Sequence, residues 1–336
     1  MPSIDEVARH AGVSLSTVSY VLSGKRPISE ATAARVRASI AELGYRPNAS
    51  ARALASRKAG AIALMAPFRG DNNVPVIMQF VAAVAEACRE RDHDVLLVTE
   101  LEGVEGVRRV SDSSLVDGVV LMDVEVDDPR AALLTAAAMP AVQIGHGSAQ
   151  DPVPYIDLDM AAASRLAVDA LADAGHRTIA LLAAPAEVYR RRSTYALRVV
   201  EGFTEQTSIR SLNGTWRQVE QSYESAAAAI YDQLREHPDT SALFVHNEAI
   251  LSFVLEILAQ RGLRVPEDIS LVAIAPDDVA RNLRIPVSNI TIPAAEIGRD
   301  AVRILFDVIE GREVASHLVD PELTVRASFQ PATGSA

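Results

Sequence analysis

Two hydrophobic patterns divide this chain at about residue 60. Before that point, apolar residues recur at helical spacing in short segments that begin after a Ser and end at a Gly. After it, short continuous apolar runs alternate with longer helical stretches. The first pattern predicts a small all-helical module. The second predicts buried parallel strands joined by helices.

The helical module has clear start and stop signals. Ser3 and Glu6 have the spacing of a capping box, and Gly12 should end the first helix. Ser14 is the next good N-cap and should open a second helix over 15–22. A small residue, a Gly and an apolar residue between two short helices are typical of a helix-turn-helix. A third helix is expected from the cap Ser29 to Gly44.

The second helix of this module has one side that faces the core and one side that faces outward. Val18 and Val21 should face a small core, whereas Leu15, Ser16 and Tyr20 should face outward. Outward residues near the start of such a helix can reach base edges in the major groove. The hydroxyls suited to phosphate oxygens are those of Ser14, Thr17, Ser19 and Ser29. DNA binding is favoured over a plain three-helix bundle, in which these residues would only cap helices.

A short helix-prone segment follows the module. Asn48 comes directly after Pro47 as a possible N-cap, and 49–55 could form about two turns of helix. A helix this short is not stable alone in water. It is therefore expected to fold only against a partner.

Beyond residue 60, the alternating pattern predicts two α/β lobes. The expected strands are 62–65, 95–98, 118–121, 141–144, 178–182, 242–245 and 270–274. The expected helices are 77–91, 103–113, 129–138, 160–174, 222–236 and 249–261. We expect two doubly wound parallel sheets, with ligands favoured at the carboxyl ends of their strands.

Charge separates the two parts further. Nine basic and four acidic residues lie in 1–58, a net charge of +5 against −12 for the whole chain, which leaves −17 for the rest. A basic head on an acidic body favours a nucleic-acid partner for the head alone.

The single cysteine, Cys88, excludes a disulfide framework and a Cys zinc site, and its side chain should be buried in the core. No metal or cofactor is expected. The chain shows no signal peptide and no apolar run of membrane-spanning length, so a cytoplasmic protein is expected.

The residues in 4–14, 17–19 and 43–48 closely resemble the head of LacI-family transcription regulators. This resemblance implies that Leu15, Ser16 and Tyr20 read bases, and family members commonly have Arg in the place of Tyr20. It also implies that the hinge folds on DNA beside its twin from a second subunit. Its minor-groove residues would then be Asn48, Ala51 and Leu54, with Leu54 as a wedge between bases.

The body resembles the periplasmic-binding-protein-like core of the same family. The matching landmarks are 116–118, 175–177, 201–203, 264–270 and 323–328. The domain boundaries that follow are a helix-turn-helix domain at 1–46, a hinge at 47–59, an effector and dimerisation domain at 60–330 and a tail at 331–336. Within the body, the N-lobe should be about 60–160 and 292–318, and the C-lobe about 161–290 and 319–330. No heptad tail follows, which favours a dimer over a coil-built tetramer.

The resemblance is weakest in the effector pocket. Only Asn247 keeps the polar type found in sugar-binding members. Gly145, Val199, Ala275 and Ile292 stand where those members have Asp, Arg, Asp and Gln. Neighbouring polar residues could rebuild the site, and the expected effector contacts are Asn247, Arg198 and Asp277. A different ligand, or none, remains open.

Two further groups of side chains could contact a ligand. The run 190–192 has three arginines, which could pair with an anionic effector, although a solvated exposed turn is favoured. His146, His176 and His246 each follow near a strand end, where a hydrogen-bonded structural role is favoured over ligand binding.

Three functions compete on this sequence. A repressor would bind a near-palindromic operator as a homodimer, under control of a small-molecule effector, for which a sugar is one candidate. A solute-binding protein would need a signal peptide. An enzyme on a Rossmann-like body would need a phosphate loop or a nucleophile elbow, and the chain has neither Gly-x-Gly-x-x-Gly nor Gly-x-Ser-x-Gly at the required place. The first function is favoured, and no enzymatic activity is expected.

Overall fold

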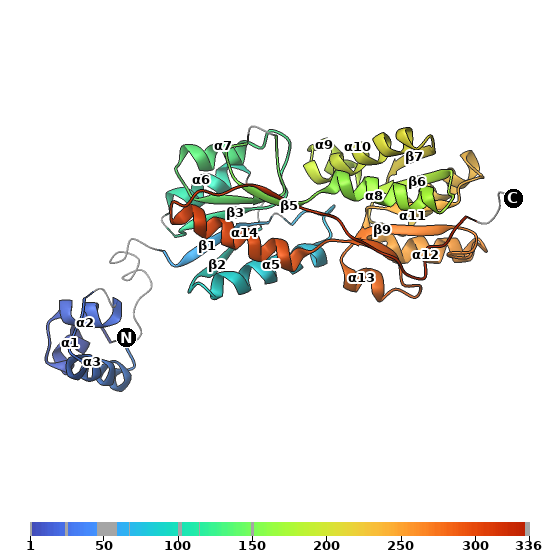
Figure 1. The fold of residues 1–336 in the computed structure, drawn as a ribbon. Helices are drawn as coiled ribbons and strands as arrows, with labels where there is room; N and C mark the ends of the chain where they lie inside the picture. Colours follow the sequence, from blue (N-terminus) through green and yellow to red (C-terminus); the bar gives the residue numbers. More distant parts are fainter. Residues whose placement is uncertain are drawn as a thin grey trace. The chain divides into compact units, whose positions relative to one another are not determined.

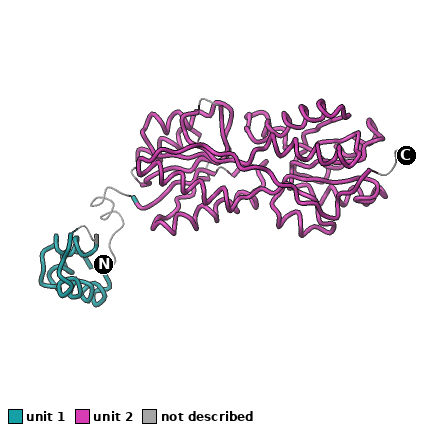
Figure 2. Tube along the Cα trace, in the orientation of Figure 1, with its two compact units in different colours: residues 1–59 teal, residues 60–336 magenta. Residues whose placement is uncertain are grey.

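The computed structural model describes residues 2–23, 26–45, 59–66, 68–99, 103–113, 115–148 and 151–332. The chain forms two compact units, residues 1–59 and residues 60–336 (Figure 2). The expected hinge helix, with Asn48, Ala51 and Leu54, lies outside the described residues.

Unit 1 is built from three short helices. They are α1 (Ile4–Ala11), α2 (Leu15–Ser23) and α3 (Glu30–Leu43). The capping box is present, since the Glu6 amide donates to the Ser3 hydroxyl at 3.3 Å and the Ser3 amide donates to the Glu6 carboxylate at 2.7 Å. Gly12 and Gly44 end α1 and α3 with φ of 62° and 61°, the left-handed conformation that glycine adopts without a Cβ penalty.

A small apolar core holds the three helices together. Val7, Val18 and Val36 are fully buried there, one from each helix. This core fixes which side of α2 faces outward. Ser29 occupies the N-cap of α3, but its hydroxyl donates to the Thr32 hydroxyl at 2.9 Å and makes no side-chain cap bond. The expected N-cap position is therefore confirmed at this helix, although the Ser29 side chain makes no cap hydrogen bond.

Unit 2 contains two six-stranded sheets (Figure 1). The N-lobe sheet has the order β11-β5-β4-β3-β1-β2 and is parallel throughout. Its strands are β1 (Ala61–Met65), β2 (Asp94–Val98), β3 (Gly118–Leu121), β4 (Ala141–Ile144), β5 (Tyr155–Leu158) and β11 (His317–Val319). Its helices are α5 (Val74–Arg89), α6 (Val104–Asp112), α7 (Pro129–Ala136) and α14 (Ala294–Ile309).

The C-lobe sheet has the order β12-β10-β9-β8-β6-β7, with β12 antiparallel to β10. Its strands are β6 (Thr178–Ala183), β7 (Asn213–Gln218), β8 (Ala242–Val245), β9 (Ser270–Ala275), β10 (Ser288–Thr291) and β12 (Leu323–Thr324). Its helices are α8 (Met160–Asp173), α9 (Ala186–Arg190), α10 (Thr194–Ile209), α11 (Tyr223–Glu236), the 3-10 turn η1 (Glu248–Ile250), α12 (Leu251–Gln260) and α13 (Asp277–Arg281).

The chain passes between the two sheets three times. It crosses after β5, again after β10, and a last time between β11 and β12. Figure 1 shows these segments running together between the lobes. Helix α14 packs on α5, so a late segment completes the N-lobe. The expected fold class, a helical head and two doubly wound parallel lobes, is confirmed.

The continuous apolar runs became the central strands. Leu64 of β1, Val120 of β3 and Phe244 of β8 are fully buried, because helices cover both faces of each sheet. Five of the described strands were not predicted: β5, β7, β10, β11 and β12. Residues 155–158 and 288–291 carry buried polar side chains whose bonds lie inside the fold, such as Asn289 Nδ2 to the Ala275 carbonyl at 2.8 Å. β7 is an exposed edge strand with little apolar pattern.

Candidate functional site

The outward side of α2 carries the residues expected to read bases. Leu15 is 46% exposed and Ser16 is exposed, whereas Ser19 and Tyr20 are half-buried. The Tyr20 ring lies beside the Arg26 guanidinium, 5.9 Å from its carbon to the ring centre. Leu15 is not part of the apolar cluster formed by the described residues of unit 1, so this side of α2 is available to a partner.

Three hydroxyls gather at the N-terminus of α2. Ser14 Oγ accepts a hydrogen bond from the Thr17 amide at 3.2 Å and lies 2.8 Å from the hydroxyls of both Ser16 and Thr17. Ser19 lies one turn further along α2, and Ser29 lies at the start of α3. Hydroxyls and free amides at a helix N-terminus form a natural site for a phosphate oxygen.

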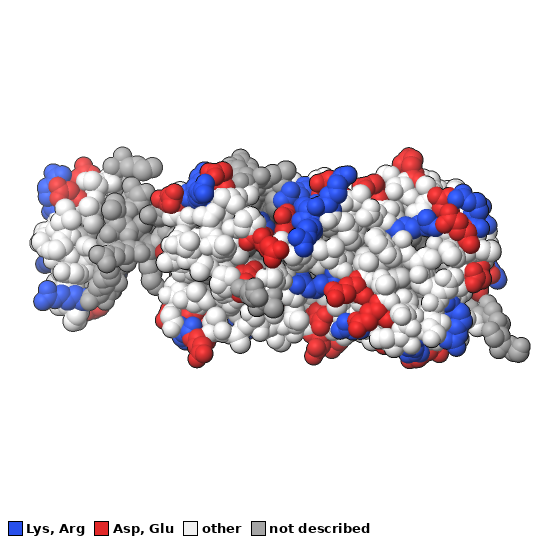
Figure 3. Space-filling view, turned by 90° about the horizontal axis from the view of Figure 1, so that it is seen from above, with Lys and Arg blue, Asp and Glu red and all other residues white. Residues whose placement is uncertain are grey.

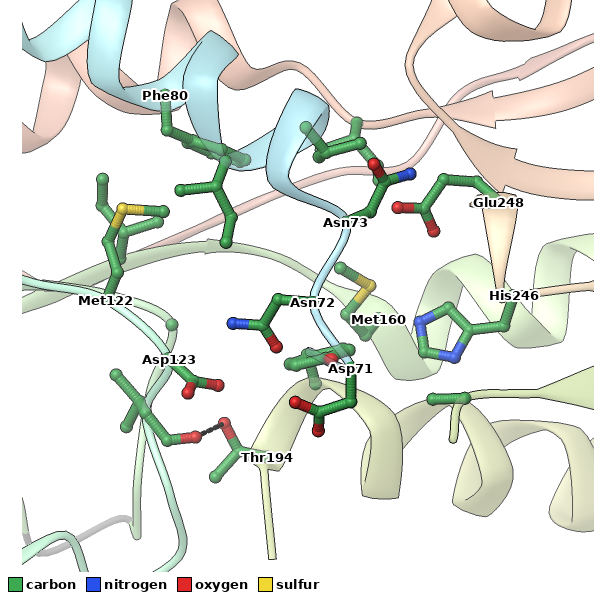
Figure 4. Close-up of a pocket in the computed structure, with 18 of the residues that line it drawn as sticks. Asp71, Asn72, Asn73, Phe80, Met122, Asp123, Met160, Thr194, His246 and Glu248 are labelled. Carbon is green, nitrogen blue, oxygen red and sulfur yellow. Dashed lines mark hydrogen bonds between the residues drawn. The ribbon is translucent and has the colours of Figure 1, made fainter. Parts of the chain in front are cut away.

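Unit 2 has a cavity of about 180 Å³ between its lobes. Residues from both lobes line it, and they follow the carboxyl ends of the strands: Ala66 after β1, Met122 after β3, Ala184 after β6 and His246 after β8. This is the position at which parallel α/β sheets bind ligands. Figure 4 shows the cavity with its lining side chains.

The cavity wall combines apolar side chains with carboxylates. The apolar side chains include Val76, Ile77, Phe80, Met122, Met160 and Ile292. The carboxylates are those of Asp71, Asp123, Asp157 and Glu248. Among the described residues that line the cavity, none is Lys or Arg. The wall is therefore richer in hydrogen-bond acceptors than in cations.

Basic side chains behind the wall lie beside these carboxylates. Arg69 Nε lies 2.9 Å from the Asp123 carboxylate, and His146 Nδ1 lies 3.4 Å from the Asp157 carboxylate. Arg191 comes from the C-lobe and bonds to Asp71 of the N-lobe. Burial lowers the pKa of Arg191, but Asp123 and Asp71 raise it more, so it stays charged. Arg69 and Arg191 offset part of the negative charge of the cavity wall.

The arginine run 190–192 does not form one exposed turn. Arg190 and Arg192 are exposed and lie near Glu187 and Asp127. The Arg191 side chain is only 8% exposed and reaches the N-lobe. The expectation of a solvated turn is therefore wrong for its central residue, because an acidic N-lobe partner 120 positions away in sequence takes it out of solvent.

Two titratable groups face the cavity from the segment after β8. Burial raises the pKa of Glu248 to about 7. Burial also lowers the pKa of His246 to about 4, so this histidine is neutral near pH 7. His246 Nδ1 is buried without a hydrogen-bond partner, and the ring meets Tyr195 edge-on with centres 5.6 Å apart. Figure 4 shows Glu248 directed toward Asn73 of the other lobe. The unpartnered nitrogen leaves a hydrogen-bonding position open on the cavity wall.

Of the three expected effector contacts, the structure places one on the cavity wall. Asn247 lines the cavity, and its Nδ2 donates to the Val219 carbonyl at 2.7 Å. Arg198 is not among the lining residues and donates to the main-chain oxygens of His146 and Gly147. Asp277 is not among them either and pairs with Arg326. Both side chains are committed to bonds within unit 2.

Sequence reasoning missed Asp71, Asp123 and Glu248. Asp123 follows β3 by two positions, just as Asn247 follows β8, so the rule that polar residues follow buried strands could have found it. Asp123 also has a φ of 53°, an unusual value for a residue other than glycine, which often marks a functional site. Asp71 carries no such signal, since it lies in the loop before α5.

Other expected roles are structural. His176 is buried, with Nδ1 2.9 Å from the Ser241 hydroxyl and Nε2 3.1 Å from the Gln330 carbonyl, as expected. Cys88 is buried in α5, also as expected. Within the described residues, no cluster of three or more His, Cys, Asp or Glu side chains could hold a metal ion. Among the same residues, no helix combines the length and apolar character that a membrane crossing requires.

Comparisons with known proteins agree with this two-part design. Residues 3–48 match the model of bacterial regulatory proteins of the lacI family, and residues 168–329 match a periplasmic binding protein-like domain. The chain is 31% identical to the HTH-type transcriptional regulator CelR of Thermobifida fusca over 341 residues, covering 97% of this chain and 98% of that one.

Solved structures show the same likeness. A complex of the transcriptional regulator CelR with cellobiose matches with a TM-score of 0.68 and 29% identity, over 98% of this chain and 100% of that chain. A lac repressor dimer bound to operator and the anti-inducer ONPF matches with a TM-score of 0.85 and 26% identity, over 98% of this chain and 99% of that chain.

The helix-turn-helix unit and the two-lobed unit with its cavity together define a ligand-regulated DNA-binding protein. The chain belongs to the lacI family of bacterial regulatory proteins. It is a sequence-specific DNA-binding transcription regulator.

Proposed function

We propose that this chain is a repressor that binds a near-palindromic operator as a homodimer and responds to a small effector in the cavity of unit 2. The observation that carries this proposal is a cavity between two lobes in a chain that also has a helix-turn-helix unit. A ligand that prefers one arrangement of the lobes shifts the population toward it, and operator affinity changes with that population.

The DNA contacts in this proposal divide by chemistry. Leu15, Ser16 and Tyr20 contact base edges in the major groove. The phosphate contacts are Ser14, Thr17, Ser19 and Ser29. The minor-groove contacts are Asn48, Ala51 and Leu54, all outside the described residues. The hydroxyls gathered at the start of α2 support the phosphate role.

The effector in this proposal is small, neutral and rich in hydroxyl groups. A cavity of about 180 Å³ is below the roughly 300 Å³ at which sites for drug-sized ligands begin. Asp71, Asp123 and Glu248 offer acceptors for hydroxyl donors, and Phe80 and Met122 offer apolar contact to a ring face. A phosphate or carboxylate would meet these carboxylates without a cation on the wall, which disfavours an anionic effector.

The effector contacts proposed here are Asn247, Asp71 and Asp123. Arg198 and Asp277 serve instead to hold unit 2 together. The solved CelR complex contains cellobiose, a neutral hydroxyl-rich compound, which supports this class of effector. A neutral sugar the size of one ring is the first choice.

We infer regulation and not catalysis, because the relatives by name are regulators and DNA binding accounts for unit 1. A protein of this kind acts in the cytoplasm, where the chromosome lies. The decisive test is a thermal-shift screen of the full chain with neutral sugars, nucleosides and sugar phosphates, followed by operator-binding titrations with each hit. Stabilisation by a neutral sugar that also changes operator affinity supports the proposal. Stabilisation by sugar phosphates alone would overturn the effector class.

A further inference from the structure

The segment between α9 and α10 docks on the opposite lobe. Ser193 forms an isolated antiparallel bridge with Glu125. The Val126 amide donates to the Arg192 carbonyl at 3.0 Å, and the Thr194 amide donates to the Val124 carbonyl at 3.1 Å. A short piece of C-lobe backbone is thus paired with the N-lobe segment that follows β3. The side chain at the start of this segment is that of Arg191.

Arg191 enters a cluster of acidic and amide groups from the N-lobe. Its guanidinium bonds to the Asp71 carboxylate, lies 3.1 Å from Asn72 Oδ1 and lies 3.6 Å from the Asp123 carboxylate. The exposed fractions of the Arg191, Asp71 and Asp123 side chains are 8%, 11% and 7%. A carboxylate this buried needs a cationic or hydrogen-bonding partner to stay charged without a large cost.

The three N-lobe partners all line the cavity. Asp123 has a second cation, Arg69, within its own lobe at 2.9 Å. For Asp71, the ion pair found in the described structure comes from the other lobe. The position of the Asp71 carboxylate therefore depends on whether the lobes are together.

We propose that Arg191 is a positioning residue of the cavity: it bridges Asp71, Asn72 and Asp123 across the cleft and so links the arrangement of the cavity wall to closure of the lobes. The inference rests on the proposed function in treating this cavity as the effector site. Arginine suits this place because its planar guanidinium can meet several acceptors at once, whereas a lysine ammonium acts as a point charge.

The test measures the distance between the lobes of the full chain, with no ligand and no DNA added. Spin labels on the exposed positions Ala136→Cys in α7 and Ser208→Cys in α10 report one lobe each in pulsed electron resonance. Cys88 is buried and burial raises its pKa to about 11, so it should not take up label. Molecules with closed lobes have a short distance between the two labels, and molecules with separated lobes have a long one. In Arg191→Gln, we expect the ratio of closed to separated molecules to fall at least about tenfold.

A second substitution separates charge from packing. Removing one member of a buried ion pair leaves the other uncompensated, whereas removing both is better tolerated. Adding Asp71→Asn to Arg191→Gln should therefore restore much of the short-distance population. Arg191→Lys keeps the positive charge and should retain more of that population than Arg191→Gln. The matched control is Arg190→Gln, whose side chain is exposed and pairs with Glu187 of its own lobe, so it should leave the distances unchanged.

The proposal is overturned if Arg191→Gln leaves the distances as in the parent chain. It is equally overturned if Asp71→Asn brings no recovery, or if Lys at this position does no better than Gln, because the side chain would then act by packing alone. Since neither ligand nor DNA is present, these outcomes do not depend on the proposed function. A failed effector screen would leave them standing.

Discussion

Arg198 of α10 donates to the His146 main-chain oxygen at 2.8 Å, which joins the C-lobe to the N-lobe segment after β4. A second bond from the same guanidinium reaches the Gly147 carbonyl at 2.9 Å. Burial lowers the pKa of Arg198, so its charge is held in a poorly solvated place. These hydrogen bonds are a second contact between the lobes, separate from the contacts made by Arg191.

Arg198→Ala should lower the stability of unit 2. Hydrogen bonds to a charged group are worth about 1.5–3 kcal/mol each, and truncation also leaves two carbonyls without this donor. A loss of several degrees in the Tm of unit 2 is expected in scanning calorimetry. Arg165→Ala, which removes an arginine from a more exposed pair with Glu205 at 3.4 Å, is the control and should change the Tm little. Equal Tm values for the two variants would contradict this account.

Glu248 should make stability depend on pH. Its pKa is about 7 in the folded chain against an ordinary 4.5, so the folded state holds its proton more tightly. The stability tied to this proton is complete below about pH 4.5 and is lost as the pH rises through 7. Glu248→Gln should be more stable than the parent at pH 8, by roughly 3 kcal/mol at most, and should differ little at pH 4. Urea unfolding at both values measures this.

The sign of that difference is the discriminating result. Burial is the largest cause of the raised pKa, and a ligand that donates a hydrogen bond to the ionised carboxylate would lower it. Glu256→Gln, on α12 and outside the cavity lining, serves as the control. A Glu248→Gln chain that is less stable than the parent at pH 8 would show that this carboxylate is held charged by its surroundings.

Leu15→Ala should weaken operator binding without unfolding unit 1. The side chain is 46% exposed and contributes little to the core around Val18. Tyr20→Arg should instead raise the preference for guanine at one base pair, by about 1–3 kcal/mol, through a bidentate contact. Titrations of the selected operator, repeated at several salt concentrations, measure both effects. Ala38→Ser, exposed on α3, is the control, and a Leu15→Ala chain with unchanged affinity would remove α2 from the interface.

Gly202→Ala should disturb the packing of α10 on α8. A Cβ at this position would lie 2.4 Å from the Ala161 carbonyl oxygen, which belongs to backbone and cannot rotate away. A cost of about 1–3 kcal/mol is expected in chemical unfolding. Gly262→Ala makes a useful contrast, since no atom lies within 4 Å there and any cost comes from its φ of 72°. An unchanged midpoint for Gly202→Ala would mean that the two helices can separate freely.

The sequence predicted the strands that consist of continuous apolar residues, because their burial follows from their composition. The apolar runs that became β1, β3 and β8 needed no tertiary information, and the caps of α1 followed from Ser3 and Glu6 alone. β7 was missed because an edge strand exposes most of its side chains and so lacks an apolar pattern. β10 was missed because Ser288 and Asn289 are buried only by virtue of partners distant in sequence.

The cavity was harder to predict for the same reason. Asp71, Asp123 and Arg191 meet only after the chain has folded into two lobes, and 120 positions separate Asp71 from Arg191. Arg190, Arg191 and Arg192 look equivalent in sequence, yet one is buried and two are exposed. On the visible face of unit 2, acidic and basic side chains are interspersed, so surface charge does not mark the site (Figure 3).

The order in which the strands are joined bears on synthesis of the chain. β11 pairs with β5 but begins at His317, after the first five strands of the C-lobe sheet have been made. Helix α14, which covers part of the N-lobe beside α5, also comes late. During synthesis the N-lobe is therefore incomplete for a time. Its β5 edge and the face that α14 covers remain exposed until the later residues have been made. Such unfinished surfaces are where nascent chains aggregate, so this protein is expected to benefit from chaperones that shield them.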